Sequence, residues 1–284
     1  MKNTNYHLFL FLTTFTRGIV EAFSLVLLYK KGFSVDNLLL FLCIMYGVGI
    51  LVNYVSLRVN YKIVLVISSL LYGVGYLYLS FMKVNLINLV IFSLLLSFGT
   101  YSYHCIRHYL ALSFMMKNTS LMVNVMFLGL IVASVVGTYL ISKLSIFWVS
   151  IILFSLSILS LVPIFKVELK EDGKKKKILI EKRKILFNIF EQFKVIFLEL
   201  QPLFLYLYIN DSIIFVGGFN IIINISALIV LFFMRKINVI KYYFFVCLGM
   251  GLVLLFKISL SNTIILFLVA VIEGIVVKLY FIRK

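Results

Sequence analysis

The chain has 284 residues, of which 63% are hydrophobic, and it carries a formal net charge of +17 at pH 7. Soluble domains are about half apolar, so this composition excludes an ordinary soluble domain and indicates a membrane protein. The two prolines, and the lack of segments that alternate apolar and polar residues, favour membrane-spanning helices over an outer-membrane barrel. The sequence therefore predicts an all-α, polytopic helical membrane protein.

Apolar runs of about 20 residues, long enough to cross a bilayer, follow one another along the whole chain. We expect spans at 7–29, 37–57, 63–82, 86–107, 120–142, 145–165, 187–209, 213–234, 242–257 and 262–281. The first run is too long and too charged for a cleavable signal peptide, so it should remain in the membrane. A polar, basic segment separates six spans from four. This predicts an N-terminal six-span bundle (1–166), a basic cytoplasmic linker (167–186) and an incomplete C-terminal bundle of four spans (187–284).

The basic residues are distributed unevenly over the connecting segments. If the N-terminus is cytoplasmic, most of the 27 lysines and arginines fall on the inside, and the outside loops hold only Lys30, Lys31, Lys83, Lys143 and Lys257. The positive-inside rule predicts this asymmetry. We therefore expect a multi-pass protein of the cell membrane, plasma or inner, with both termini cytoplasmic. Its positive charge faces the anionic lipid bilayer and needs no nucleic-acid partner.

The first expected span contains two full charges near its middle, Arg17 and Glu21, in the stretch TFTRGIVEAF. Each alone costs about 2.5 to 3.5 kcal/mol at the bilayer centre, and a spacing of four allows the two side chains to pair on one helical face. A buried structural salt bridge is one interpretation, but such pairs stabilise poorly compared with apolar residues. A functional role facing a cavity or pathway is therefore favoured.

Two later spans carry regularly spaced residues with a structural interpretation. His104 and His108 lie four apart near the inside end of the fourth span, among tyrosines typical of the membrane interface. Two ligands alone do not make a metal site, so interface anchoring is favoured and no metal or other cofactor is predicted. In the fifth span, Gly129, Ala133 and Gly137 form a stripe of small residues that predicts close helix packing.

The second half of the chain resembles the first in sequence. YGVGYL (72–77) matches LGMGLV (248–253) at an offset of 176 residues, which relates spans 1 to 4 to spans 7 to 10 in the same order. This predicts parallel repeats about an axis along the membrane normal. A shift of 178 carries Glu21 onto Glu199 in the seventh span, with Gln201 beside it. Glu273, in the tenth span, has no basic residue three or four positions away.

Six spans, a basic inside loop and a repeated second half resemble the layout of the major facilitator superfamily, without the last two of its twelve spans. The family's loop between spans 2 and 3 carries G-x-x-x-D-R-x-G-R-[RK]-x-x-L, and residues 53–65 read NYVSLRVNYKIVL. Arg58 and Lys62 fall on matching positions, whereas Leu57 replaces the acid, so gating must differ from the family's or be impaired. Asn60 replaces a glycine, which we interpret as tolerance of a left-handed backbone.

The resemblance implies two pseudo-symmetric bundles whose first and seventh spans face each other across a central cavity. Glu21 and Glu199 would then flank one binding and coupling site, with Arg17, Gln201 and Glu273 as further candidates. Another group of residues, Arg58, Asn60 and Lys62, would form a gating loop. The function implied is secondary active transport of a small solute by alternating access, with protons as a candidate coupling ion.

An alternative remains open: a truncated, non-transporting remnant or membrane interaction protein, in which an oligomer covers the helix faces left by the missing spans. No nucleotide-binding loop and no Ser, His, Asp arrangement occurs in the sequence. Acid-rich loops for a metal or a diphosphate are also lacking. An enzyme is therefore not expected.

Overall fold

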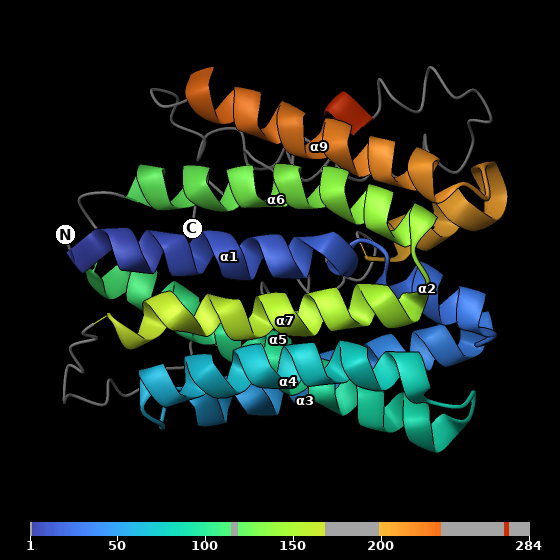
Figure 1. Ribbon diagram of the computed structural model, residues 1–284, viewed down its shortest axis with the longest axis horizontal. Coiled ribbons are helices and arrows are strands. Elements are labelled where there is room, and N and C mark those ends of the chain that lie inside the picture. Colours follow the sequence, from blue (N-terminus) through green and yellow to red (C-terminus); the bar gives the residue numbers. More distant parts are fainter. Residues whose placement is uncertain (1, 115–118, 168–198, 234–269, 273–284) are drawn as a thin grey trace, which may run out of the picture.

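The computed structural model describes residues 2–114, 119–167, 199–233 and 270–272. Its helices share a common direction, and Figure 1 shows α9 beside α6, α6 beside α1, and α7, α5, α4 and α3 stacked beyond them. The helices are α1 (Lys2–Glu21), α2 (Ser24–Lys31), α3 (Val35–Ser56), α4 (Tyr61–Phe81), α5 (Leu86–Phe114), α6 (Thr119–Lys143), α7 (Ile146–Phe165), the π-helix η1 (Leu205–Ile209) and α9 (Ile213–Phe233). Residues 199–204 are also helical and lead directly into η1.

Five of these helices are long and apolar enough to cross a membrane, and the bent pair Thr4–Glu21 and Ser24–Lys31 makes a sixth candidate. The five are Val35–Ser56, Tyr61–Phe81, Leu86–Arg107, Asn124–Lys143 and Ile146–Phe165, which agree with predicted spans two to six within a few residues. The chain is therefore a polytopic helical membrane protein. The predicted span 213–234 corresponds to α9. Apart from residues 270–272, the last two predicted spans lie outside the described residues, as do most of the linker and residues 187–198.

Apolar side chains cover the outside of the bundle as well as its core. On α3, Ile50 and Leu51 each expose 67% of their surface, although both lie in the middle of a helix. Such a surface would be unfavourable in water, whereas in a bilayer it contacts acyl chains at no cost. This outward apolar face fits the contact with lipid that the spans imply.

The first span is not the single helix that the sequence predicts. Helix α1 ends at Glu21, α2 begins at Ser24, and the two are bent by 41°. The break contains neither proline nor glycine. Instead, the Phe23 amide donates to the Val20 carbonyl at 2.8 Å, and the Ser24 hydroxyl donates to the same carbonyl at 3.0 Å. Both bonds compete with the regular helical ladder at Val20. The expectation of an uninterrupted first span is therefore wrong, and Glu21 is the last residue of α1.

The stripe of small residues on α6 packs directly against α1, which confirms its prediction as a close-packing surface. A Cβ atom added to Gly18 would lie 2.8 Å from the Ala133 Cβ, and one added to Gly137 would overlap the backbone of Ile19. The other small residue, Gly129, lies against the carbonyl of Phe11. Glycine and alanine at these positions allow the two backbones to approach each other without loss of contact.

Helix α9, from the second half of the chain, packs on the neighbouring face of α6. A Cβ on Gly217 would overlap the side chain of Thr138, so this glycine also permits close approach. Two turns further along α9, the Asn224 Nδ2 donates to the Ser134 Oγ at 3.1 Å. The described part of the second half thus packs against the first through a small-residue contact and a partly buried hydrogen bond.

Candidate functional site

The Arg17 side chain points into the helix bundle, where it is 2% exposed. Its Nη2 donates to the Gly99 carbonyl at 2.8 Å, and its guanidinium carbon lies 4.3 Å from the ring centroids of both Tyr72 and Tyr103. Cation–π contacts of this kind contribute about 2 kcal/mol when the cation is desolvated. The cation is therefore accommodated by two aromatic faces and one carbonyl.

This arrangement differs from the ion pair that the spacing of Arg17 and Glu21 suggests. Of the described side chains, the ion-pair contact of Glu21 is with His104, whose Nε2 lies 4.0 Å from Oε1. Arg17 is directed toward α4 and α5 instead, and its Nε and Nη1 have no hydrogen-bond partner among the described residues. Arg17 still interacts electrostatically with Glu21, as does Arg107 on α5. Its charge thus influences the carboxylate from a distance.

Glu21 and Glu199 lie together in one cavity of about 30 Å³. Glu21 comes from the end of α1, whereas Glu199 comes from the short helical segment at the start of the second half. The volume is enough to hold a water molecule. The other lining residues are Ser24, Leu25, Phe41, Met45, Tyr72, Tyr76, Leu96 and Thr100, from helices α2 to α5. The structure thus places the two predicted acids in a shared cavity between helices α1 to α5 and the segment that begins at Glu199.

Hydroxyl groups and aromatic rings surround these two carboxylates. Glu199 interacts electrostatically with Tyr46 on α3 and Tyr101 on α5, whose rings are 5.8 Å apart in an edge-to-face arrangement. On the opposite side, the hydroxyls of Ser24 and Tyr76 are hydrogen-bonded at 2.6 Å. A cavity with two carboxylates and several hydroxyls can bind protons, water or a cationic group.

The remaining predicted site residues lie elsewhere. Gln201 is buried, with 6% exposure, two residues after Glu199, but it is not among the side chains that line the cavity. Glu273 lies outside the described residues. Of the five predicted binding or coupling residues, the structure therefore brings Glu21 and Glu199 together, with Arg17 held nearby behind the Tyr72 ring.

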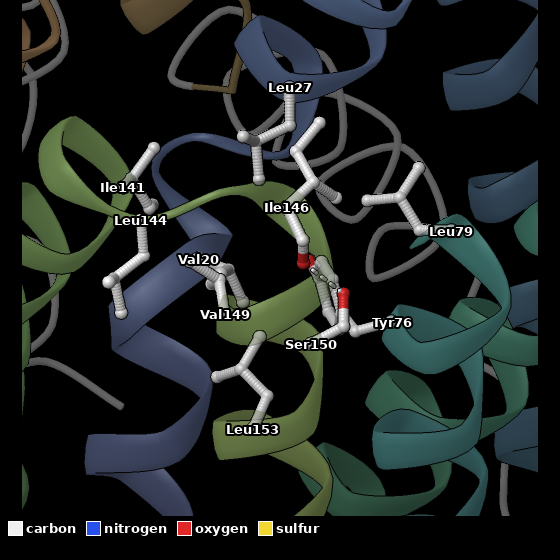
Figure 2. A pocket seen from close by; sticks show the side chains of 10 residues that line it. All are labelled: Val20, Leu27, Tyr76, Leu79, Ile141, Leu144, Ile146, Val149, Ser150 and Leu153. Atoms are coloured by element: carbon white, nitrogen blue, oxygen red, sulfur yellow. Dashed lines mark hydrogen bonds between the residues drawn. The ribbon is translucent and has the colours of Figure 1, made fainter. Parts of the chain in front are cut away.

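A second cavity, of about 10 Å³, lies between α1, α2, α4, α6 and α7. Figure 2 shows that its wall is almost entirely aliphatic, with the hydroxyl oxygens of Tyr76 and Ser150 as its polar groups. This volume is at the lower limit for one water molecule, so the cavity is a packing defect rather than a solute site. Tyr76 lines both cavities.

The residues of the predicted gating loop make contacts at the ends of helices. Asn60 has φ −53° and ψ 122°, and its Oδ1 accepts from the backbone amides of Lys62 at 3.0 Å and Ile63 at 3.2 Å. It is therefore the N-cap of α4. Our interpretation of Asn60 as a left-handed substitute for glycine is wrong, because an extended backbone is what places its side chain over the first amides of the helix.

Two lysines connect α4 to its neighbours. Lys62 Nζ, in the first turn of α4, donates to the Phe165 carbonyl at 3.0 Å, at the end of α7. At the opposite end of α4, the Ser80 carbonyl accepts from Lys31 Nζ at 3.1 Å. Each ammonium group satisfies a carbonyl in the last turn of a helix, where a positive charge is favourable. Arg58 folds back onto Tyr54, with its guanidinium carbon 4.0 Å from the ring centroid.

Sequence reasoning missed His104, which it assigned to the membrane interface. His104 lies one helical turn after Thr100, a residue that lines the cavity, and its ring approaches Glu21 from α5. The spacing of four places Thr100 and His104 on one face of α5, but nothing in the sequence marks that face as the one beside Glu21. The side chain of His108 lies outside the described residues.

Comparison with models of protein families finds no match, and a search of the curated proteins finds none either. The class that the fold defines is therefore a multi-span helical membrane protein. The described residues contain five or six candidate spans, and helices α1 to α5 together with Glu199 line a small cavity that holds two carboxylates.

Proposed function

We propose that this protein is a secondary active transporter that moves a small solute across the cell membrane by alternating access, with coupling to protons. The observation that carries the proposal is the shared cavity of Glu21 and Glu199. Carboxylates within membrane spans are costly and usually face a substrate or ion pathway. Two of them, one from each half of the chain, give such a pathway a binding site at the boundary between the halves.

The break in the first span supports the same proposal. Helix α1 ends at Glu21, beside the cavity, and Ser24 and Leu25 of α2 line it. Non-helical backbone within a membrane span is tolerated where it is buried in protein or lines a cavity. Discontinuous helices of this kind form the substrate and ion sites of many transporters. The interruption is therefore in the position that a binding site requires.

In this proposal the carboxylates of Glu21 and Glu199 bind protons or a cationic group of the solute. Arg17 stabilises the ionised form of Glu21 through its field, and Gln201 and Glu273 remain candidates for the solute path. Rocking of the two halves would give alternating access, as the resemblance to the major facilitator superfamily implies. Arg58, Asn60 and Lys62 would then control the ends of the helices at the face where both termini are proposed to be cytoplasmic. No enzymatic activity is proposed.

The test uses the full chain, purified and reconstituted into lipid vesicles. A thermal-shift screen against classes of small solutes identifies a stabilising solute, and its uptake is then measured with and without an imposed pH gradient. We expect Glu21→Gln and Glu199→Gln each to abolish the part of the uptake that depends on the gradient. Asp211→Asn is the matched control, because Asp211 is an exposed acid between η1 and α9.

Unchanged coupling in both glutamate variants would contradict the proposed roles of the carboxylates. If the folded wild-type chain neither binds a solute in the screen nor moves one under a gradient, the proposal fails. The non-transporting interaction protein would then be the better description.

A further inference from the structure

We propose that His104 relays protons between Glu21 and the water at the end of the bundle where α1 begins. This inference rests on the proposed function, because it assigns the path by which protons reach the shared cavity. It starts from a contact that joins two helices, the 4.0 Å approach of His104 Nε2 to Glu21 Oε1. Chains of acidic and histidine side chains within membrane spans are a recurring form of proton path.

Both side chains of this pair are partly exposed, Glu21 by 40% and His104 by 33%. Their chain neighbours Val20 and Tyr103 are buried, whereas Ala22, Cys105 and Arg107 are partly exposed as well. The pair therefore lies at the edge of the packed core and is not enclosed within it. In the proposed relay, water that reaches this edge exchanges protons with His104.

The direction of the path follows from how α1 and α5 lie against each other. Gly99 contacts Arg17 through its carbonyl, and four residues later the Tyr103 ring lies 6.2 Å from the ring of Phe9. The two helices are therefore antiparallel. Moving along α5 from Thr100, in the cavity, to His104 leads one turn toward the start of α1. His104 thus extends the polar lining of the cavity toward that end of the bundle.

The proposed proton transfer needs only the two side chains and water. When Glu21 is protonated, its O–H bond breaks and an N–H bond forms at Nε2, which leaves a carboxylate and an imidazolium. The imidazolium then gives its Nδ1 proton to water, which leaves the neutral ring with its hydrogen on Nε2, and rotation of the ring or exchange through water restores the Nδ1 tautomer before the next transfer. A distance of 4.0 Å exceeds a direct hydrogen bond, so a bridging water or a small rotation of Glu21 completes the contact.

The charge balance at Glu21 depends on its charged neighbours. Arg17 on α1 and Arg107 on α5 interact with Glu21 electrostatically, and so does Glu199. Binding of a proton or a cationic solute at Glu199 changes this balance, and so links the relay to occupancy of the cavity. The titratable and charged groups described around the pair are Arg17, Tyr46, Tyr72, Tyr76, Tyr101, Tyr103, Arg107 and Glu199.

The experiment follows the proton itself, so that it needs no identified solute. The full chain in lipid nanodiscs is subjected to a rapid change of pH, and the carboxylic acid C=O stretch of Glu21 is followed by time-resolved infrared spectroscopy. The band is assigned by its loss in Glu21→Gln. We expect His104→Gln to slow the response of this band by about 100-fold, the lower end of the usual contribution of a positioned acid–base group, and free imidazole in the buffer to restore it.

A matched control is His7→Gln, because His7 lies on α1 more than two turns before Arg17 and should leave the rate unchanged. A structural role for His104 predicts a different result: either no slowing, or slowing that imidazole does not restore, and each would overturn the proposal. If His104→Gln does not fold, Glu21→Asp provides the second variant. Its carboxylate is one methylene further from His104, and an unchanged rate there would contradict the relay.

The relay and the proposed transport can fail separately. A relay that works in nanodiscs, together with vesicles that never move a solute under a gradient, would reject transport while retaining the proton path. Gradient-driven uptake that persists in His104→Gln at the wild-type rate would reject the relay while retaining transport.

Discussion

Arg17 and Tyr72 hold each other by two separate contacts. The Tyr72 ring lies under the guanidinium of Arg17, 4.3 Å from its centroid to the guanidinium carbon, and the Tyr72 hydroxyl donates to the backbone carbonyl of Arg17 at 3.2 Å. One aromatic residue of α4 thus compensates both a buried charge and a backbone carbonyl of α1. This contact fixes the helix that carries Glu21 against the helix that lines the cavity beside it.

The two contacts are separable by mutation. Tyr72→Phe removes the hydroxyl and is expected to lower the free energy of unfolding by about 1 kcal/mol, the usual net contribution of one hydrogen bond. Tyr72→Leu also removes the aromatic face and should cost about 2 kcal/mol more, because the desolvated guanidinium loses a cation–π partner. Thermal unfolding in detergent measures both. Equal losses in the two variants would show that the ring contributes nothing to holding Arg17.

Two glycine-to-alanine substitutions, one on α6 and one on α9, are expected to have different effects, because Gly137 lies in the close contact with α1 and Gly218 faces open space. Gly137→Ala places a Cβ against the backbone of Ile19, so the helices must separate, at a cost of about 1 to 3 kcal/mol. Gly218→Ala meets no atom within 4 Å and should be neutral or stabilising by up to about 1 kcal/mol, because alanine is the better helix former. Melting temperatures of the two variants test the pair, and a neutral Gly137→Ala would contradict the packing.

The attachment of α9 to α6 can be tested by a compensating pair. Gly217→Ala is expected to be destabilising by about 1 to 3 kcal/mol, since the new Cβ overlaps the Thr138 side chain. Thr138→Gly removes the obstructing atoms, so Gly217→Ala should cost far less in that background. A double-mutant cycle of unfolding free energies measures the coupling. If the losses of unfolding free energy in the two single variants simply add in the double variant, positions 217 and 138 are not in contact.

The cap at the start of α4 predicts a graded series at position 60. Asn60→Ala should cost about 1 kcal/mol, because the amides of Lys62 and Ile63 lose their side-chain acceptor. Asn60→Asp retains an oxygen at the same position and should be close to wild type. Unfolding free energies in detergent distinguish the two. A harmless Asn60→Ala would instead favour a backbone role for Asn60.

Much of the fold is predictable from the sequence, because the position of each span depends on the transfer free energy of its own apolar residues, which is large. Transferring about 20 apolar residues out of water decides where a helix crosses the bilayer, so segments such as Val35–Ser56 and Ile146–Phe165 lie where their composition predicts. The small-residue stripe of α6 is equally local. Its spacing predicts a close-packed face without any knowledge of the partner helix.

The cavity depends on information that the spacing alone does not contain. A membrane helix that is apolar on all sides gives no periodic signal for which face turns inward, so neither the orientation of Arg17 toward Tyr103 nor the approach of His104 to Glu21 could be predicted. Both contacts join helices far apart in sequence. The break after Glu21 was missed for another reason: no proline or glycine marks it in the sequence between Glu21 and Ser24.

Lys31 and Lys62 bind α4 at opposite ends, one reaching its last turn from α2 and the other reaching from its first turn to the end of α7. Helix α4 is therefore held at both ends by a hydrogen bond between a lysine and a carbonyl. Tilting α4 alone would break the hydrogen bond between an ammonium group and a carbonyl at one of its ends, at a cost of about 0.5 to 1.5 kcal/mol. We therefore expect α2, α4 and α7 to move together in a large motion, and the bend between α1 and α2 is a further position where the bundle can flex.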